Sequence, residues 1–234
     1  ADATLPQFAN RPANLHIERP RTIVHPECMT LGDDIWLGPG TLLMAITRYP
    51  SVSMQPPGGA RSVQEFRPRI VIGHRVTSTA GLQIAAVSEV IVEDDVMFAS
   101  NINLTDGLHG YQTADEPYKY QPMFRIAPIV IGRGSWIGQN VVIQPGVTIG
   151  QQTIVGANSV VNRSLPARCI AVGAPARVIK RWDARRRARV PAMRCRSAGA
   201  SGSGTGMPRN PASPHIGRGD RGGLPGQVPA SLSE

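Results

Sequence analysis

The chain has 234 residues, enough for one sizeable core, and it is 41% hydrophobic but only 5% aromatic. Its 25 glycines and 21 prolines argue against a helical bundle and for a turn-rich chain with an aliphatic core. The formal net charge of +9 does not mark a nucleic-acid-binding domain, because residues 184–234 hold nine arginines against two acidic residues and the rest is nearly neutral.

The three cysteines, Cys28, Cys169 and Cys195, are odd in number and widely spaced. They match neither a disulfide framework nor a zinc site. No charged-then-apolar leader opens the chain, and no run of 18 apolar residues occurs in it. We therefore expect a cytoplasmic protein that does not insert into membranes.

Residues 1–24 are expected to lead into a repeat domain that spans residues 25–183. Within this domain, apolar residues recur at every sixth position, with one polar exception at Ser78. The first three sets are Leu31, Leu37 and Leu43, then Ile72, Ser78 and Ile84, then Val92, Phe98 and Leu104. A period of six is neither the helical 3.6 nor a strand's 2, so it predicts a short strand and a tight corner, repeated. The corners carry Gly, Asp and Asn, which tolerate left-handed backbone angles.

Two long segments interrupt this repeat. Residues 44–69 contain Pro50, Pro56 and Pro57, and residues 105–128 begin with Thr105-Asp-Gly-Leu-His-Gly-Tyr111. Long loops on a rigid repeat usually carry function. We therefore expect the functional residues to lie mainly on these loops.

The most regular part of the repeat follows the second loop. Its members are aliphatic and six residues apart: Ile131, Ile137, Ile143, Ile149, Val155 and Val161. A second set of small or β-branched residues follows the first five members by four positions: Ser135, Val141, Val147, Thr153 and Ser159. Glycines and β-branched residues at these positions exclude an amphipathic helix. The pattern predicts coils of short strands, stacked about 4.7–4.9 Å apart.

Two stretches carry a family resemblance. The sequence Ile129-Val-Ile-Gly-Arg-Gly-Ser-Trp-Ile-Gly-Gln-Asn-Val-Val-Ile-Gln-Pro-Gly-Val-Thr-Ile-Gly150 resembles the hexapeptide-repeat acetyltransferases, which include galactoside, maltose and O-antigen or capsule enzymes. The stretch Val172-Gly-Ala-Pro-Ala-Arg-Val-Ile179 resembles the closing motif of that family. The resemblance implies a left-handed parallel β-helix with an extended catalytic loop and a short C-terminal helix, which residues 184–189 would extend. It also implies a homotrimer with active sites between neighbouring subunits.

The same resemblance, extended without gaps from Val92 through Leu104, places His109 on the family's catalytic histidine. Related sugar-modifying enzymes often read Asp-His-x-His-Gly, whereas this chain has Asp106-Gly-Leu-His-Gly110 and lacks the first histidine. An imidazole suits the reaction because its usual pKa near 6.5 allows it to accept a hydroxyl proton and return it to the departing CoA thiolate. The family transfers the acetyl group directly from acetyl-CoA, without a Cys or Ser nucleophile.

The resemblance implies further contacts with the acceptor and the cofactor. Asp106, Tyr111 and Gln121 could orient His109 or hold a sugar acceptor, although each could equally brace the loop. The positions expected to bind CoA are Ala99, Gly138, Gln139, Ala157, Asn162, Arg163, Arg177 and Lys180. The cationic members suit the CoA phosphates, but each is individually also typical of a solvated surface charge.

Three other functions remain open on the same fold. A metal-dependent carbonic anhydrase is disfavoured, because the five histidines include no closely spaced pair, so we expect no metal site. An amine (N-)acyltransferase and a non-catalytic repeat scaffold are not excluded. Residues 184–234 form an Arg/Gly/Pro/Ser-rich segment without aromatic residues, which predicts a disordered tail. We expect this tail to be passive, with no specific nucleic-acid partner.

Overall fold

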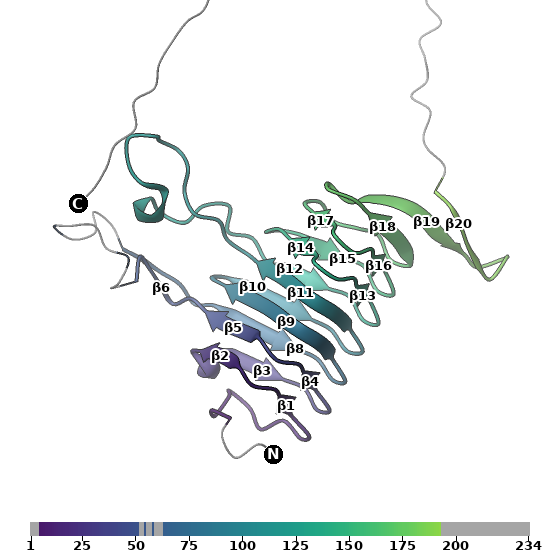
Figure 1. Cartoon of the computed structure of the whole chain (residues 1–234), viewed down its shortest axis with the longest axis horizontal. Helices are drawn as coiled ribbons and strands as arrows, with labels where there is room; N and C mark the ends of the chain where they lie inside the picture. The colour runs from purple at the N-terminus through teal and green to yellow at the C-terminus, as the bar shows by residue number, and fades with distance from the viewer. Residues whose placement is uncertain (1–4, 52–53, 55–57, 59–62, 193–234) are drawn as a thin grey trace, which may run out of the picture. The chain divides into compact units, whose positions relative to one another are not determined.

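The computed structural model describes residues 5–51, 54, 58 and 63–192. The chain divides into two units, residues 1–193 and 194–234, and the second unit lies outside the described residues. The predicted disordered tail therefore falls almost entirely outside the described part. Within that part the chain is built of short strands, with 3-10 turns at η1 (Pro26–Cys28) and η3 (Tyr118–Tyr120). Figure 1 shows the strands stacked as successive rungs.

Parallel pairing arranges these strands in three walls. The first wall contains β1 (His16–Ile17), β4 (Trp36–Leu37), the start of β9 (Thr77–Ala86), the start of β11 (Met97–Thr105), β13 (Trp136–Ile137), β16 (Ile154–Val155) and β18 (Cys169–Val172). The second wall contains β2 (Arg21–Val24), β5 (Thr41–Ala45), the ends of β9 and β11, β14 (Val142–Ile143) and β17 (Val160–Val161). The third wall contains β3 (Met29–Leu31), β8 (Arg69–Ile72), β10 (Glu89–Val92), β12 (Ile129–Ile131) and β15 (Thr148–Ile149).

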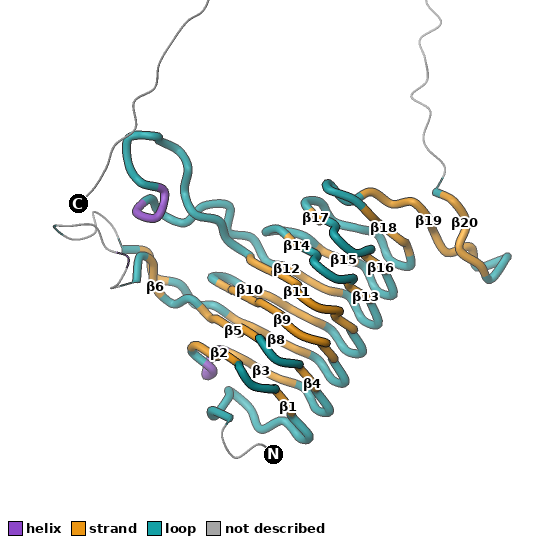
Figure 2. Tube along the Cα trace, in the orientation of Figure 1, coloured by secondary structure: helices purple, strands orange, loops and turns teal. Residues whose placement is uncertain are grey.

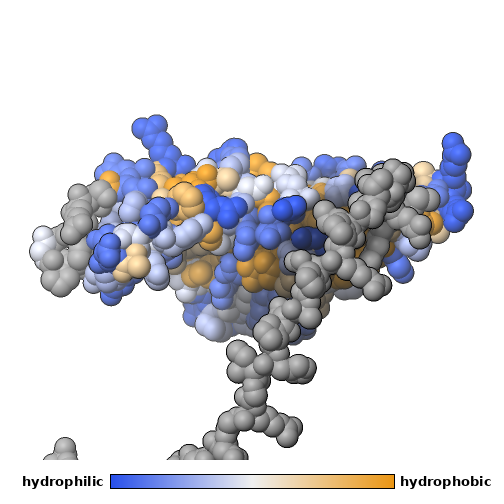
Figure 3. Space-filling view, turned by 90° about the horizontal axis from the view of Figure 1, so that it is seen from above, coloured by the Kyte–Doolittle hydropathy of each residue, from blue (hydrophilic) through white to orange (hydrophobic). Residues whose placement is uncertain are grey.

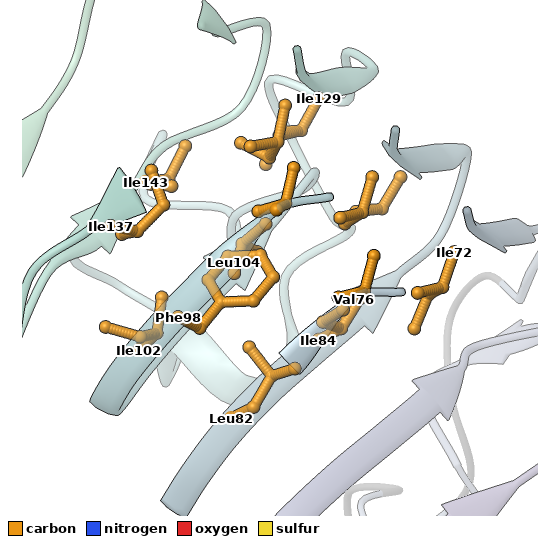
Figure 4. Close-up of a cluster of buried hydrophobic side chains, with 14 of the residues drawn as sticks. Ile72, Val76, Leu82, Ile84, Phe98, Ile102, Leu104, Ile129, Ile137 and Ile143 are labelled. Atoms are coloured by element: carbon orange, nitrogen blue, oxygen red, sulfur yellow. The ribbon is translucent and has the colours of Figure 1, made fainter. Parts of the chain in front are cut away.

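The walls enclose one aliphatic core, and the predicted six-residue sets supply it. Every aliphatic or aromatic member of those sets is at most 1% exposed, and Ser78 is 5% exposed. The second set of small residues is buried as well, from Ser135 to Ser159. Figure 4 shows Phe98, Leu104, Ile137 and Ile143 among the side chains that point into this core. Burying each large aliphatic side chain stabilises the fold by about 1.5–3 kcal/mol. The prediction of an all-β chain of stacked hexads is confirmed.

The outer face of the first wall carries large apolar side chains. Trp36, Thr77, Met97 and Trp136 are partners in successive parallel pairs, so their side chains form a ladder on this face. Trp36 is 55% exposed, and Met97 and Trp136 are each 46% exposed. Hydrophobic surface is also visible among hydrophilic residues on the face seen in Figure 3.

The corners between the walls have the backbone geometry that the sequence predicts. Asp34, Asp95 and Asn158 all have positive φ angles, near 60°. At one corner, asparagine side chains from successive coils are hydrogen-bonded in a ladder, from Asn101 to Asn140 at 3.1 Å and from Asn140 to Asn158 at 3.0 Å.

Gly38 shows why the corners need glycine even where φ is ordinary. Its amide donates to the carbonyl oxygen of Ser78 in the next coil, at 2.9 Å. A Cβ atom added at this position would lie 1.8 Å from the carbonyl oxygen of Thr79. The two coils can therefore approach at the normal inter-strand spacing only because residue 38 has no side chain.

The stack begins before residue 25, within the segment treated above as a lead-in. Strands β1 and β2 both lie there and pair with the next coil. Residues 5–15 then cover the open edge of this first coil. The side chain of Asn10 donates to the carbonyl oxygen of Leu31 at 2.7 Å and accepts from its amide at 3.0 Å. Phe8 and Leu15 are buried against the core below it.

The predicted short C-terminal helix is wrong. Residues 177–191 form an antiparallel hairpin of β19 (Arg177–Asp183) and β20 (Ala188–Pro191), which continues the sheet beyond β18. Val178, Ile179 and Val190 are β-branched and favour strands over helix. The carboxylate of Asp183 accepts the amides of Arg185 and Arg186, at 2.9 and 3.1 Å, which stabilises a turn at that point.

Candidate functional site

Both long loops leave the stack at the same corner, between the second and third walls. One runs from β5 to β8 and contains the small antiparallel pair β6 (Arg48–Tyr49) and β7 (Gln64–Glu65). The other runs from β11 to β12. Because β5 pairs with β9 and β9 pairs with β11, the loops emerge two coils apart. Figure 2 shows the loop between β11 and β12, with the η3 turn, and the β6 segment of the other loop projecting from the stack.

The two loops are joined to each other. The side-chain oxygen of Gln64 accepts the amide of Met123 at 2.6 Å, and its nitrogen donates to the carbonyl of the same residue at 3.3 Å. Tyr49, Val87 and Met123 form a small buried cluster, separate from the main core. The first loop therefore supports the second, which carries His109.

His109 is exposed at the base of the second loop, five residues beyond the core residue Leu104. The backbone is fixed on its N-terminal side, because Leu108 and Phe124 exchange two hydrogen bonds, of 2.8 and 2.7 Å. Nδ1 of the imidazole lies 2.9 Å from the hydroxyl oxygen of Tyr49. The two rings are tilted by 58°, with centroids 5.2 Å apart. No other partner of the His109 side chain is found among the described residues, so Nε2 is open to a ligand.

Asp106 is fully buried, which corrects the expectation that it holds the acceptor. Its two carboxylate oxygens accept the amides of Val87 and Ser88 from the preceding coil, at 2.7 and 2.8 Å. Burial raises the pKa of Asp106, although the hydrogen bonds from the two amides oppose the shift. The residue anchors the start of the loop to the tight corner at residues 87–88.

Replacing Asp106 by leucine should destabilise the chain. Leucine cannot accept a hydrogen bond, so the amides of Val87 and Ser88 would remain buried without an acceptor, at about 1–3 kcal/mol for each. Urea unfolding would measure the change. Glu116→Leu in the same loop is the matched control, because no hydrogen bond of its carboxylate is found among the described residues. Equal stability of the two variants would contradict the anchoring role.

Gln121 is the second correction, because it braces the loop and is not available to a substrate. Its side chain is 2% exposed. The amide oxygen accepts the backbone amides of Gln112 and Thr113, at 2.9 and 3.3 Å. The amide nitrogen donates to the carbonyl oxygens of Thr113 and Glu116, at 2.8 and 2.9 Å. All four hydrogen-bonding positions of the side chain are thus directed at the loop itself.

Tyr111 differs from these two residues because it is 56% exposed. Its ring contacts Phe124 edge-on, at a centroid distance of 5.4 Å. An acceptor contact by Tyr111 remains a prediction that the geometry allows.

The residues expected to bind CoA fall in three places. Ala99, Gly138, Gln139 and Ala157 lie on successive coils at the corner between the first and second walls. Asn162 and Arg163 directly follow β17, at the opposite edge of the second wall. This is the edge from which the His109 loop emerges, because Leu104 pairs with Ile143 and Ile143 with Val161.

The remaining two, Arg177 and Lys180, lie on β19 and are exposed. The Arg177 guanidinium donates to the carbonyl of Ala176 at 2.9 Å. The predicted positions from Ala99 to Arg163 therefore border the second wall on both of its edges. His109 lies on one of these edges.

A groove of about 540 Å³ lies elsewhere, across the corner between the third and first walls. It is lined by Gly134, Trp136, Gln152, Ile154, Arg168, Trp182 and Arg189. None of these residues belongs to the His109 loop or to the predicted CoA positions. The residues that the sequence predicts to be functional therefore do not line this groove.

Two further observations concern only the part of the chain that the structure describes. It contains no cluster of three or more His, Cys, Asp or Glu side chains that could hold a metal ion. It also contains no helix with the length and apolar character needed to cross a membrane.

Comparison with known proteins shows which family model and which enzymes the chain is similar to. The "Bacterial transferase hexapeptide (six repeats)" family matches residues 128–163. Galactoside O-acetyltransferase of Escherichia coli K12 is 29% identical over 164 residues, which cover 70% of this chain and 69% of that protein. WbbJ of the same strain, provisionally named a lipopolysaccharide biosynthesis O-acetyl transferase, is 35% identical over 108 residues. That match covers 44% of this chain and 55% of WbbJ, so it spans about half the length of that relative.

A solved structure supports the fold. A variant of AntD, an N-acyltransferase from Bacillus cereus in complex with dTDP and coenzyme A, superposes with a TM-score of 0.55 at 20% identity. The superposition covers 76% of this chain and 86% of the AntD chain. At this identity the likeness concerns the fold alone. The chain therefore contains a hexapeptide-repeat segment at residues 128–163 and is similar in sequence to named O-acetyltransferases.

Proposed function

We propose that the chain transfers an acetyl group from acetyl-CoA to a hydroxyl of a sugar or polysaccharide precursor, with His109 as the general base. The observation that carries this proposal is the placement of His109. Its imidazole is exposed at one edge of the second wall, held at Nδ1 and open at Nε2. The named activities of the galactoside enzyme and WbbJ support a hydroxyl acceptor and a role in polysaccharide synthesis.

The reaction requires one proton transfer in each direction. As the acceptor oxygen attacks the thioester carbonyl, the imidazole removes the hydroxyl proton. When the carbon–sulfur bond breaks, the imidazolium returns that proton to the CoA sulfur. The imidazole is then neutral again, so the base is regenerated without a covalent enzyme intermediate. A backbone N–H of the coil wall would stabilise the oxyanion.

The cofactor would lie along the second wall. Its pantetheine arm would contact the backbone near Ala99, Gly138, Gln139 and Ala157, and Asn162 would lie at the far edge. Arg163, Arg177 and Lys180 would pair with the CoA phosphates, because they are exposed cations at the C-terminal end of the stack. The complex of AntD with coenzyme A supports this cofactor for the fold. Because acetyl-CoA is a cytoplasmic metabolite, we place the enzyme in the cytoplasm.

We further propose that the coils wind left-handed and that three copies form a trimer with shared active sites. The exposed apolar ladder of Trp36, Met97 and Trp136 supports subunit packing, because a monomer would leave these side chains in water. Sedimentation of the purified chain measures the assembly. A monomer at micromolar concentration would contradict the trimer.

Release of the CoA thiol, with acetyl-CoA and a panel of acceptors, tests the activity. The panel should pair hydroxyl sugars, such as galactosides, maltose and nucleotide sugars, with matched amino sugars. We expect acceptor-dependent thiol release with at least one hydroxyl sugar, above the rate of acetyl-CoA hydrolysis without acceptor. Release only with amino sugars would favour the N-acyltransferase alternative, and release with neither class would favour a non-catalytic scaffold.

A further inference from the structure

A short chain of hydrogen bonds links the first loop to the proposed base. Tyr49, on β6 of the first loop, donates its hydroxyl proton to the backbone carbonyl oxygen of Lys119. The same hydroxyl oxygen lies 2.9 Å from Nδ1 of His109. Tyr49 is 4% exposed and packs with Val87 and Met123. Two residues of the second loop thus fix its hydroxyl group, while Val87 and Met123 pack against the residue.

The direction of these bonds determines where the imidazole proton lies. A carbonyl oxygen can only accept, so the single hydroxyl proton of Tyr49 is used for Lys119. Toward His109 the phenol oxygen can then act only as an acceptor. Nδ1 must therefore donate, and in a neutral imidazole the lone pair is left on Nε2.

We propose that Tyr49 is a positioning residue that holds His109 in the Nδ1–H tautomer and so makes Nε2 the proton-accepting atom. The catalytic meaning of this inference depends on the proposed function, but the tautomer itself does not. During transfer, Nε2 would take the hydroxyl proton as the acceptor oxygen bonds to the acetyl carbon. It would release the proton to sulfur as the carbon–sulfur bond breaks, while the Nδ1–H bond to Tyr49 persists throughout.

The surroundings of Tyr49 favour this role over simple packing. Burial raises the pKa of the Tyr49 phenol, so the hydroxyl keeps its proton and remains able to donate to Lys119. The accepting carbonyl belongs to η3 of the second loop, whereas Tyr49 belongs to the first loop. The contact between the two loops therefore aligns the imidazole of His109.

The variant Tyr49→Phe tests the proposal, because phenylalanine keeps the ring and its packing but removes the hydroxyl. Nitrogen NMR of the full chain, with ¹⁵N-labelled histidine, distinguishes a protonated ring nitrogen from an unprotonated one. The His109 signals are assigned by their absence in His109→Gln. In the wild-type chain we expect a protonated Nδ1 and an unprotonated Nε2. In Tyr49→Phe we expect the share of the Nε2–H tautomer to rise.

The kinetic expectation is specific to a positioning role. Loss of one neutral hydrogen bond should lower kcat by about 2- to 10-fold, while KM for acetyl-CoA stays unchanged. Tyr118→Phe is the matched control, because Tyr118 lies in the second loop with His109 and is 58% exposed. It should change neither the NMR spectrum of His109 nor kcat.

The NMR result separates this inference from the proposed function. An Nε2–H tautomer in the wild-type chain, or an unchanged tautomer in Tyr49→Phe, would overturn the inference even if acetyl transfer is observed. If no acetyl transfer is found but the tautomer shifts as expected, the positioning of His109 is supported and only the proposed function fails.

Discussion

Replacing His109 by alanine is expected to lower kcat for acetyl transfer by about 10²–10⁴-fold, which is the usual contribution of general-base catalysis. The acceptor hydroxyl would then have to lose its proton to water. Binding of acetyl-CoA should change little, because the predicted cofactor contacts lie on the coils and not on the loop. Steady-state kinetics with the best acceptor of the panel, together with KM for acetyl-CoA, measures both quantities.

The control for this variant is His74→Ala. His74 is an exposed histidine at a corner of the coils, where its Nδ1 accepts the amide of Asp33 at 3.0 Å. Its loss should leave kcat unchanged within a factor of about two. Both variants should unfold near the wild-type temperature. If His109→Ala is folded and retains the wild-type kcat, the general-base mechanism is contradicted.

Gly38→Ala is expected to produce the largest loss of stability among single methyl additions in the coils. The new Cβ would lie 1.8 Å from the carbonyl oxygen and 2.6 Å from the carbonyl carbon of Thr79. Both atoms belong to the backbone of the next coil, so the clash can be relieved only by separating the coils and losing the hydrogen bond to Ser78. We expect the free energy of unfolding to fall by at least about 3 kcal/mol, as measured by chemical denaturation.

Gly156→Ala provides the matched comparison. Gly156 also has an ordinary φ angle, but its added Cβ would meet only the Val172 side chain at short range, at 2.7 Å. A side chain can rotate or shift, so we expect a smaller loss of stability than at Gly38. Equal losses in the two variants would show that the close approach of the backbone at Gly38 does not limit stability.

The repeat could be predicted from the sequence because each core position is set by local spacing. Ile137 and Leu104, for example, are buried because every sixth residue turns inward, and this requires no knowledge of distant partners. The first coil was missed although Ile17 and Ile23 are also six residues apart. The interval from Ile23 to Leu31 is eight residues, because the chain includes the 3-10 turn η1 at this point. The two extra residues interrupt the six-residue spacing of the core positions, so the first coil cannot be recognised from that spacing.

The C-terminal hairpin was mispredicted for a different reason. The helix was implied by the family resemblance, whereas the local residues favoured strands. Val178, Ile179 and Val190 are β-branched, and Asp183 is a common turn residue. This local signal was present in the sequence and identifies the hairpin better than the resemblance does.

The loop residues could be predicted only in part. The loop and His109 follow from the interrupted repeat and the resemblance, and the catalytic role itself remains a prediction. That Asp106 and Gln121 are buried could not be foreseen, because burial of a polar side chain depends on partners that are distant in sequence. Tyr49 is 60 residues from His109 and belongs to no periodic set, so only the folded arrangement of the two loops reveals it.

Residues 5–15 cover the first coil and so hinder end-to-end association of the stack with other chains. An uncovered row of amide and carbonyl groups at the end of a parallel stack would recruit strands from other chains, and such growth has no natural stopping point. The amide side chain of Asn10 forms hydrogen bonds with both backbone groups of Leu31. Because the partner is a side chain, it presents no new strand edge with which another chain could pair. A single side chain thus helps to prevent the stack from polymerising into a fibre.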